Sequence, residues 1–151
     1  MWHEDLTEYD FFGRKLSKKL FGENYSTIPI AIGWLEYGKP YKTGIVPEGL
    51  CEKLYEFFKT REISHYFLGV HACDLCEIEL PPTQLNIIAG LGSRTTFLAY
   101  RNTLYIFPDL IVHYINTHNY LPPSGFIEAV LSSTPQETIE YFKQISLKWY
   151  S

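Results

Sequence analysis

The spacing of apolar residues along the chain predicts several helices. Between residues 6 and 21, apolar side chains recur every three or four positions, the period of a helix with one buried face, and Gly22 ends the run. Residues 47–59 begin with a proline and carry a broad apolar stripe, so a second helix is expected there. A third helix begins at Pro108 and is stopped by the proline pair at residues 122–123.

Two more helices are predicted in the C-terminal part of the chain, over residues 123–131 and 135–150. Thr134 precedes the last of them, and Glu137 follows three residues later. In this capping-box arrangement, the two side chains bond to backbone N–H groups that the first helical turn leaves without a partner. We therefore expect the last helix to begin at residue 135.

Four segments have the β-branched and apolar character of strands: residues 28–35, 65–70, 95–100 and 103–107. The last two flank Arg101 and Asn102 closely enough to form a hairpin. Together with the helices, these strands predict an α+β fold, in which several helices pack on a small antiparallel sheet. A length of 151 residues suits a single globular domain over residues 1–151.

The formal net charge of −4 argues against a nucleic-acid partner, since a basic surface normally supplies most of the affinity for nucleic acids. Four basic residues do share one face of the first predicted helix, and we interpret them as a solvated face, with an anion site as the alternative: Arg14, Lys15, Lys18 and Lys19.

The distribution of apolar residues and cysteines bears on location and partners. No apolar run is long enough to span a membrane, and the N-terminus has no signal-peptide pattern. Three cysteines are too few for a disulfide framework, so we expect a cytoplasmic protein. Aromatic residues make up 17% of the chain, which suits an aromatic core or a surface for a protein partner. The oligomeric state stays open.

The pair Cys73-x-x-Cys76 is the most distinctive chemical feature of the sequence. Two cysteines at this spacing on a tight turn supply half of a structural zinc site, and a helix often supplies two histidines as the other half. His113 and His118, with four residues between them, follow Pro108 on the third predicted helix. The two pairs therefore predict one Zn2+ site.

Two features complicate this site. Positions five apart on an ideal helix point about 140° away from each other, so His118 reaches the site only if the helix loosens near its end. His71 lies two residues before Cys73, on the same side of an extended strand, and is a fifth candidate for four ligand positions. One of the three histidines must therefore lie outside the ligand set or have another role.

Two other interpretations of the cysteine pair stay open. Cys73 and Cys76 could be ordinary buried thiols, as we expect for Cys51, which falls within the apolar stripe of the second helix. A thioredoxin-like redox pair is less well supported. Such a pair opens a helix after the first strand of a βαβ unit, and the surrounding sequence shows no such unit.

The sequence contains three further patterns: Gly33-Trp34-Leu35, the cluster from His71 to Cys76, and Pro-Asp-Leu-Ile-Val-His-Tyr-Ile-Asn-Thr-His-Asn-Tyr-Leu-Pro-Pro-Ser-Gly-Phe at residues 108–126. With these motifs it resembles a family of small, largely uncharacterised bacterial proteins. The resemblance covers most of the chain after residue 28. It implies neither a reaction nor a substrate, but it does imply that five residues belong to one site: His71, Cys73, Cys76, His113 and His118.

We expect a zinc-stabilised protein-binding module, such as a bacterial immunity or accessory factor, because four protein ligands can close the site completely. The alternative is a metal-dependent hydrolase or deaminase, in which Asp74, Glu77 or the spare histidine acts as general base. A redox or metal sensor that releases zinc when its cysteines are oxidised is a third hypothesis.

The absence of motifs that mark established enzyme classes favours a binding function over catalysis. The sequence contains no His-Glu-x-x-His, Walker or Gly-x-Ser-x-Gly motif. Cys73 also stands where a zinc deaminase has its glutamate. We therefore assign no catalytic residue.

Overall fold

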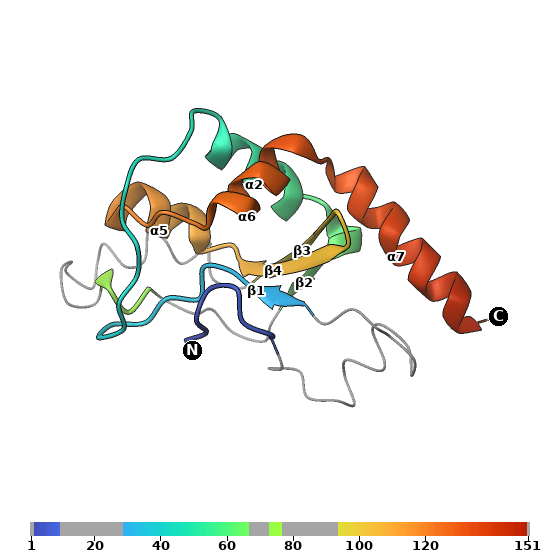
Figure 1. Ribbon diagram of the computed structural model, residues 1–151, viewed down its shortest axis with the longest axis horizontal. Coiled ribbons are helices and arrows are strands. Elements are labelled where there is room, and N and C mark those ends of the chain that lie inside the picture. The colour runs from blue at the N-terminus through green and yellow to red at the C-terminus, as the bar shows by residue number, and fades with distance from the viewer. Residues whose placement is uncertain (1, 10–28, 67–72, 77–93, 151) are drawn as a thin grey trace.

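The computed structural model of the protein describes residues 2–9, 29–66, 73–76 and 94–150. In this part of the chain, one sheet has the strand order β1-β4-β3-β2, with β1 at Ile30–Ala31, β2 at Ser64–Tyr66, β3 at Arg94–Tyr100 and β4 at Thr103–Pro108. The helices are α2 (Leu50–Phe58), α5 (Ile111–His118), α6 (Ser124–Ser132) and α7 (Pro135–Tyr150), with a 3-10 turn, η1, at Arg61–Ile63. The prediction of an α+β fold is confirmed (Figure 1).

The centre of the sheet is the predicted hairpin of β3 and β4, which pair antiparallel from Thr95 opposite Pro108 to Tyr100 opposite Thr103. Arg101 and Asn102 form its turn with φ angles of 46° and 65°. Two consecutive positive φ angles match the right-handed twist of the strands that they join. β2 extends the antiparallel part of the sheet along β3.

β1 departs from the antiparallel prediction, because it pairs parallel to β4, with Ile30 opposite Tyr105 and Ala31 opposite Ile106. Two parallel strands need a long connection. Along the sequence, the chain from β1 to β4 passes through α2, η1, β2 and β3. The strand is also shorter than the predicted segment 28–35. Gly33, just beyond it, takes a φ of 77°, which turns the backbone out of the extended conformation.

The prediction of a helix from residue 6 is wrong for residues 6–9, and residues 10–21 lie outside the described part of the chain. Residues 6–9 instead run beside the start of β1. The Leu6 N–H donates to the carbonyl oxygen of Ala31 (2.9 Å), and the Tyr9 N–H donates to that of Pro29 (2.8 Å). These bonds to a distant segment of the same chain satisfy backbone groups that a helix would have paired internally. The four basic residues at positions 14–19 also lie outside the described residues.

Side chains alternate between the two faces of the hairpin, as the period of a strand requires. Leu98 and Phe107 face the core cluster that also contains buried residues of α2, α5 and α6. Phe97 and Ile106 face a second cluster, which Trp34 and the N-terminal segment cover. In Figure 1, α2 and α6 accordingly lie above the sheet, α5 lies to its left, and the N-terminal segment lies below it.

The remaining helix boundaries follow local chemistry. α5 begins at Ile111 and not at Pro108, because Pro108 is still paired in β4, opposite Thr95. α7 begins as predicted, with the Glu137 N–H donating to Oγ1 of Thr134 (3.3 Å). Among the helices in the described residues, none is both long enough and apolar enough to cross a bilayer.

Because Gly33 has no side chain, Ile111 at the start of α5 can pack closely against the backbone just after β1. A Cβ atom at Gly33 would lie 2.8 Å from Cδ1 and 2.9 Å from Cγ1 of Ile111, at a φ that side chains disfavour. We expect Gly33→Ala to lower the free energy of unfolding by about 2–4 kcal/mol, measured by urea denaturation.

Gly38→Ala is the matched control for this substitution. Gly38 has a similar φ of 88°, but no described atom lies within 4 Å of its Cβ position. It should therefore show the backbone cost alone, about 1–2 kcal/mol. Equal losses in the two variants would mean that the contact with Ile111 is unimportant.

Candidate metal centre

Cys73 and Cys76 lie on a tight turn, closed by the Cys76 N–H donating to the carbonyl oxygen of Cys73 (3.2 Å). Leu75 anchors this turn in the main hydrophobic core, and the Asp74 carboxylate accepts a bond from the Tyr37 N–H (3.3 Å). Both cysteine side chains are fully buried. The turn therefore presents two thiols to the interior of the protein.

His118 is the last residue of α5, directly before a wide backbone turn. The Asn119 N–H donates to the carbonyl oxygen of Tyr114, five residues back, and the Tyr120 N–H donates to the same oxygen (3.1 Å). A bond of this span closes a wider turn than the regular four-residue step. α5 is α-helical through His118, and this wider turn follows at Asn119. From the last position of the helix, the His118 ring lies with its centroid 5.1 Å from that of His113.

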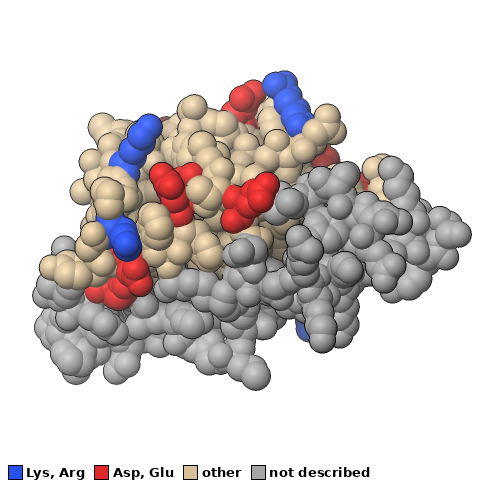
Figure 2. Space-filling model, turned by 60° about the horizontal axis from the view of Figure 1, so that its bottom comes forward, with Lys and Arg blue, Asp and Glu red and all other residues tan. Residues whose placement is uncertain are grey.

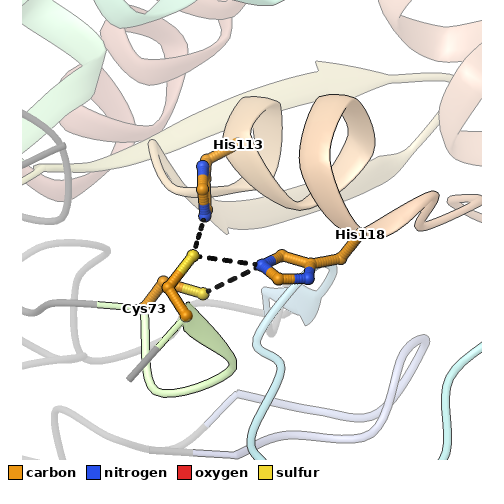
Figure 3. Close-up of side chains that lie close together, drawn as sticks. Cys73, His113 and His118 are labelled. Carbon is orange, nitrogen blue, oxygen red and sulfur yellow. Dashed lines mark hydrogen bonds between the residues drawn. The ribbon is translucent and has the colours of Figure 1, made fainter. Parts of the chain in front are cut away.

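The four side chains converge in one buried cluster. Sγ of Cys76 lies 2.9 Å from Nε2 of His113 and 3.3 Å from Nε2 of His118, and Sγ of Cys73 lies 3.6 Å from Nε2 of His118 (Figure 3). All four potential ligand atoms lie within 4.8 Å of one another. His113 and His118 are 8% and 7% exposed, so water has little access to the cluster.

These distances suit a tetrahedral metal ion. Zn–S bonds of about 2.3 Å and Zn–N bonds of about 2.0 Å give tetrahedron edges of about 3.3–3.8 Å between ligand atoms. An S–N edge would be about 3.5 Å, so the shortest observed separation, 2.9 Å from Cys76 to His113, would widen by about 0.6 Å around a bound ion, and separations as long as 4.8 Å would shorten by about 1 Å. The cluster can therefore hold a metal ion after side-chain shifts of an ångström or less.

Residues outside the cluster hold the end of α5. The Tyr41 hydroxyl donates to the carbonyl oxygen of His118 (3.2 Å), and the Gly44 N–H donates to that of Asn119 (3.0 Å). Asn119 has a φ of 56°, a left-handed conformation in which asparagine is common. These bonds satisfy carbonyl groups that the last helical turn leaves without an intrahelical partner.

A second link joins the residues after α5 to the N-terminal segment. The Tyr120 hydroxyl donates to Oδ2 of Asp5 (2.6 Å), and the Gly33 N–H donates to Oδ1 of the same carboxylate (2.9 Å). Burial raises the pKa of Asp5, although both hydrogen bonds oppose this effect. The carboxylate thus ties two distant segments, the one that carries Asp5 and the one that carries Gly33, to the exit of α5.

Comparison with known proteins identifies the family. A family model described as a domain of unknown function, DUF7919, matches residues 1–131. The chain belongs to this family. The DUF7919 match includes the cysteine turn and α5 and ends within α6, so all four clustered side chains lie inside it. No curated protein and no solved structure is significantly similar to the chain.

The structure of this DUF7919 chain brings together four of the five predicted ligands: Cys73, Cys76, His113 and His118. His71 and the candidate base Glu77 lie outside the described residues. Cys51 packs on the core from α2, and its sulfur lies 3.6 Å from Oδ1 of Asn116, away from the cluster.

Sequence reasoning missed Thr117 and Tyr41, which contact the histidines without being potential ligands. Oγ1 of Thr117 lies 3.3 Å from Nδ1 of His113. Thr117 follows His113 by four residues, and this spacing could have predicted that the two side chains lie on the same face of the helix. Tyr41 reaches His118 from a remote loop, and nothing in the sequence indicates that contact.

Burial disfavours the charged forms of Cys73 and His113. It raises the pKa of the Cys73 thiol to about 12, because little water stabilises the thiolate. Burial, together with the neighbouring His118, lowers the pKa of His113. A metal ion would therefore displace a proton from Cys73 on binding.

The raised pKa of Cys73 predicts a loss of stability in alkali for metal-free protein. A solvated cysteine thiol has an ordinary pKa of 9.0, and in the folded protein the pKa is about 12, so between these values the unfolded chain releases a proton that the folded chain keeps. The free energy of unfolding should then fall as the pH rises above 9.

Denaturant unfolding in the presence of a chelator, from neutral pH to about pH 10, measures this effect. Cys73→Ala is the control, because the thiol contributes nothing to the pH dependence of its free energy of unfolding. If the free energy of unfolding fell equally with pH in the parent and the variant, the folded thiol would titrate normally.

Proposed function

We propose that the chain is a zinc-stabilised domain whose role is binding and not catalysis. The observation that carries this proposal is the buried convergence of two cysteine sulfurs and two histidine Nε2 atoms within 4.8 Å. Structural zinc sites use this donor set in a tetrahedron, and the metal contributes directly to the stability of the fold.

The donor set favours zinc over other common ions. Thiolate and imidazole ligands suit zinc, whereas magnesium and calcium prefer oxygen ligands. In the described residues, the cluster itself offers two sulfurs and two nitrogens and no carboxylate. A tetrahedral arrangement of these four atoms matches zinc best.

The number of ligands favours a structural role. A catalytic zinc has three protein ligands and keeps its fourth position for water or substrate, while four protein ligands fill the tetrahedron. With Cys73, Cys76, His113 and His118 in place, a bound ion would need no ligand from His71. The same count argues against the hydrolase or deaminase alternative.

Binding of a protein partner is the role that we infer for the stabilised domain. Several large apolar side chains are exposed, and Ile45 is 97% exposed on the segment that Gly44 holds to the end of α5. On the face in Figure 2, acidic and basic side chains are interspersed in the described part, and neither sign forms a large patch. Shape and apolar contact, more than charge, would then select the partner.

Metal content tests the ligand set. We expect about one zinc per chain in purified parent protein by elemental analysis, and a substantial loss of zinc in Cys73→Ser, Cys76→Ser, His113→Ala and His118→Ala. Cys51→Ser is the matched control and should keep the metal, because Cys51 lies outside the cluster. Full metal content in the four ligand variants would rule out this site.

Thermal unfolding with a chelator tests the structural role. Removal of the metal should lower the melting temperature by roughly 10 °C or more, because a closed zinc site contributes several kcal/mol to folding. The chelator should have no effect on Cys73→Ser protein. A metal-free parent that is as stable as the loaded protein, but that loses a hydrolytic activity, would instead support the enzyme alternative.

A further inference from the structure

His113 has a neighbour at each of its two ring nitrogens. Nε2 lies 2.9 Å from Sγ of Cys76, and Nδ1 lies 3.3 Å from Oγ1 of Thr117, four residues further along α5. His113 is buried, whereas Thr117 is exposed on the outer side of the helix. The ring thus connects the buried cluster to a hydroxyl at the surface.

The chemistry of imidazole gives this contact a consequence. A neutral imidazole carries one N–H, and its other nitrogen has the lone pair that binds a metal. For Nε2 to be the ligand atom, the proton of His113 must stay on Nδ1. The opposite tautomer would place an N–H at Nε2, pointing at Cys76, and would block that ligand position.

We propose that Thr117 is a positioning residue for the metal centre, because its hydroxyl accepts the Nδ1–H bond of His113 and so keeps Nε2 as the ligand atom. This inference rests on the proposed zinc site. Histidine ligands generally donate their second N–H to an oxygen acceptor, which orients the ring and increases its basicity as a ligand.

Local structure makes Thr117 suitable for this role. Residues four apart on a helix lie on the same face, and the branched side chain of threonine has few rotamers in a helix. Asn116 is the other exposed residue of α5, and its side-chain oxygen lies near Sγ of Cys51 instead (3.6 Å). Of these two exposed residues, Thr117 is therefore the one beside His113.

Affinity for Zn2+ alone, measured by competition with a chelating indicator, tests the proposal. Loss of such an acceptor usually weakens metal binding 10–100-fold, and water at this exposed position would replace part of the bond, so we expect about a tenfold loss for Thr117→Val. Thr117→Ser keeps the hydroxyl and should restore most of the affinity. Thr103→Val makes the same chemical change on β4 and should bind like the parent.

The tautomer of His113 in metal-free protein gives a second readout, which a change in overall stability would not move. Long-range correlation spectra of the 15N-labelled ring should show Nδ1–H in the parent and in Thr117→Ser. Thr117→Val should shift the population towards Nε2–H. The absorption of the Co2+-loaded proteins would show whether the donor set is retained in each variant.

The possible outcomes separate this inference from the proposed function. Parental zinc affinity in Thr117→Val, an equal loss in Thr117→Ser, or an unchanged tautomer population would each overturn the role of Thr117 and leave the zinc site standing. A parent that binds no zinc would overturn the proposed function, and the role of Thr117 would fall with it.

Discussion

Two thiols and two imidazoles share a space in which no two ligand atoms are more than 4.8 Å apart. Close packing of this kind is compatible with a buried position only while the groups are neutral or share a cation, because an isolated charge there would lack solvation. The raised pKa of Cys73 and the lowered pKa of His113 favour the neutral forms of these two groups, and a bound metal ion would be the shared cation. The rest of the site is arranged around this constraint.

The position of His118 in the cluster depends on the C-terminal end of α5. An ideal helix would direct His118 away from His113, yet from the last position of α5, next to the wide turn at Asn119, its ring centroid lies 5.1 Å from that of His113. The contacts of Tyr41 and Gly44 then satisfy the carbonyl groups at the helix end. Thus contacts from remote residues hold the end of the helix where its last side chain meets the cysteine turn.

Much of this arrangement could be predicted from local sequence. The turn at Arg101 and Asn102 and the tight turn of Cys73 and Cys76 depend on neighbouring residues, and the structure has both in their expected form. At Thr134 it has one of the two bonds of the expected capping box, from the Glu137 N–H to the Thr134 hydroxyl. The loosening of the helix that we expected before His118 comes only after it, at Asn119.

Non-local pairing accounts for what the sequence did not reveal. Residues 6–9 have a helical pattern, but their N–H groups pair with residues 29–31, which lie in another part of the chain. β1 likewise takes a parallel neighbour from beyond α2 and β3. No local periodicity encodes such partners, and the contact of Tyr41 with His118 is hidden for the same reason.

The hydrogen bond between Asp5 and Tyr120 joins residues that are 115 positions apart. Synthesis proceeds from the N-terminus, so the segment that carries Asp5 leaves the ribosome well before its partner exists. Cys73 and Cys76 also emerge before either histidine, and β1 emerges before β4. The nascent chain therefore exposes two thiols and a strand edge until α5 has been made.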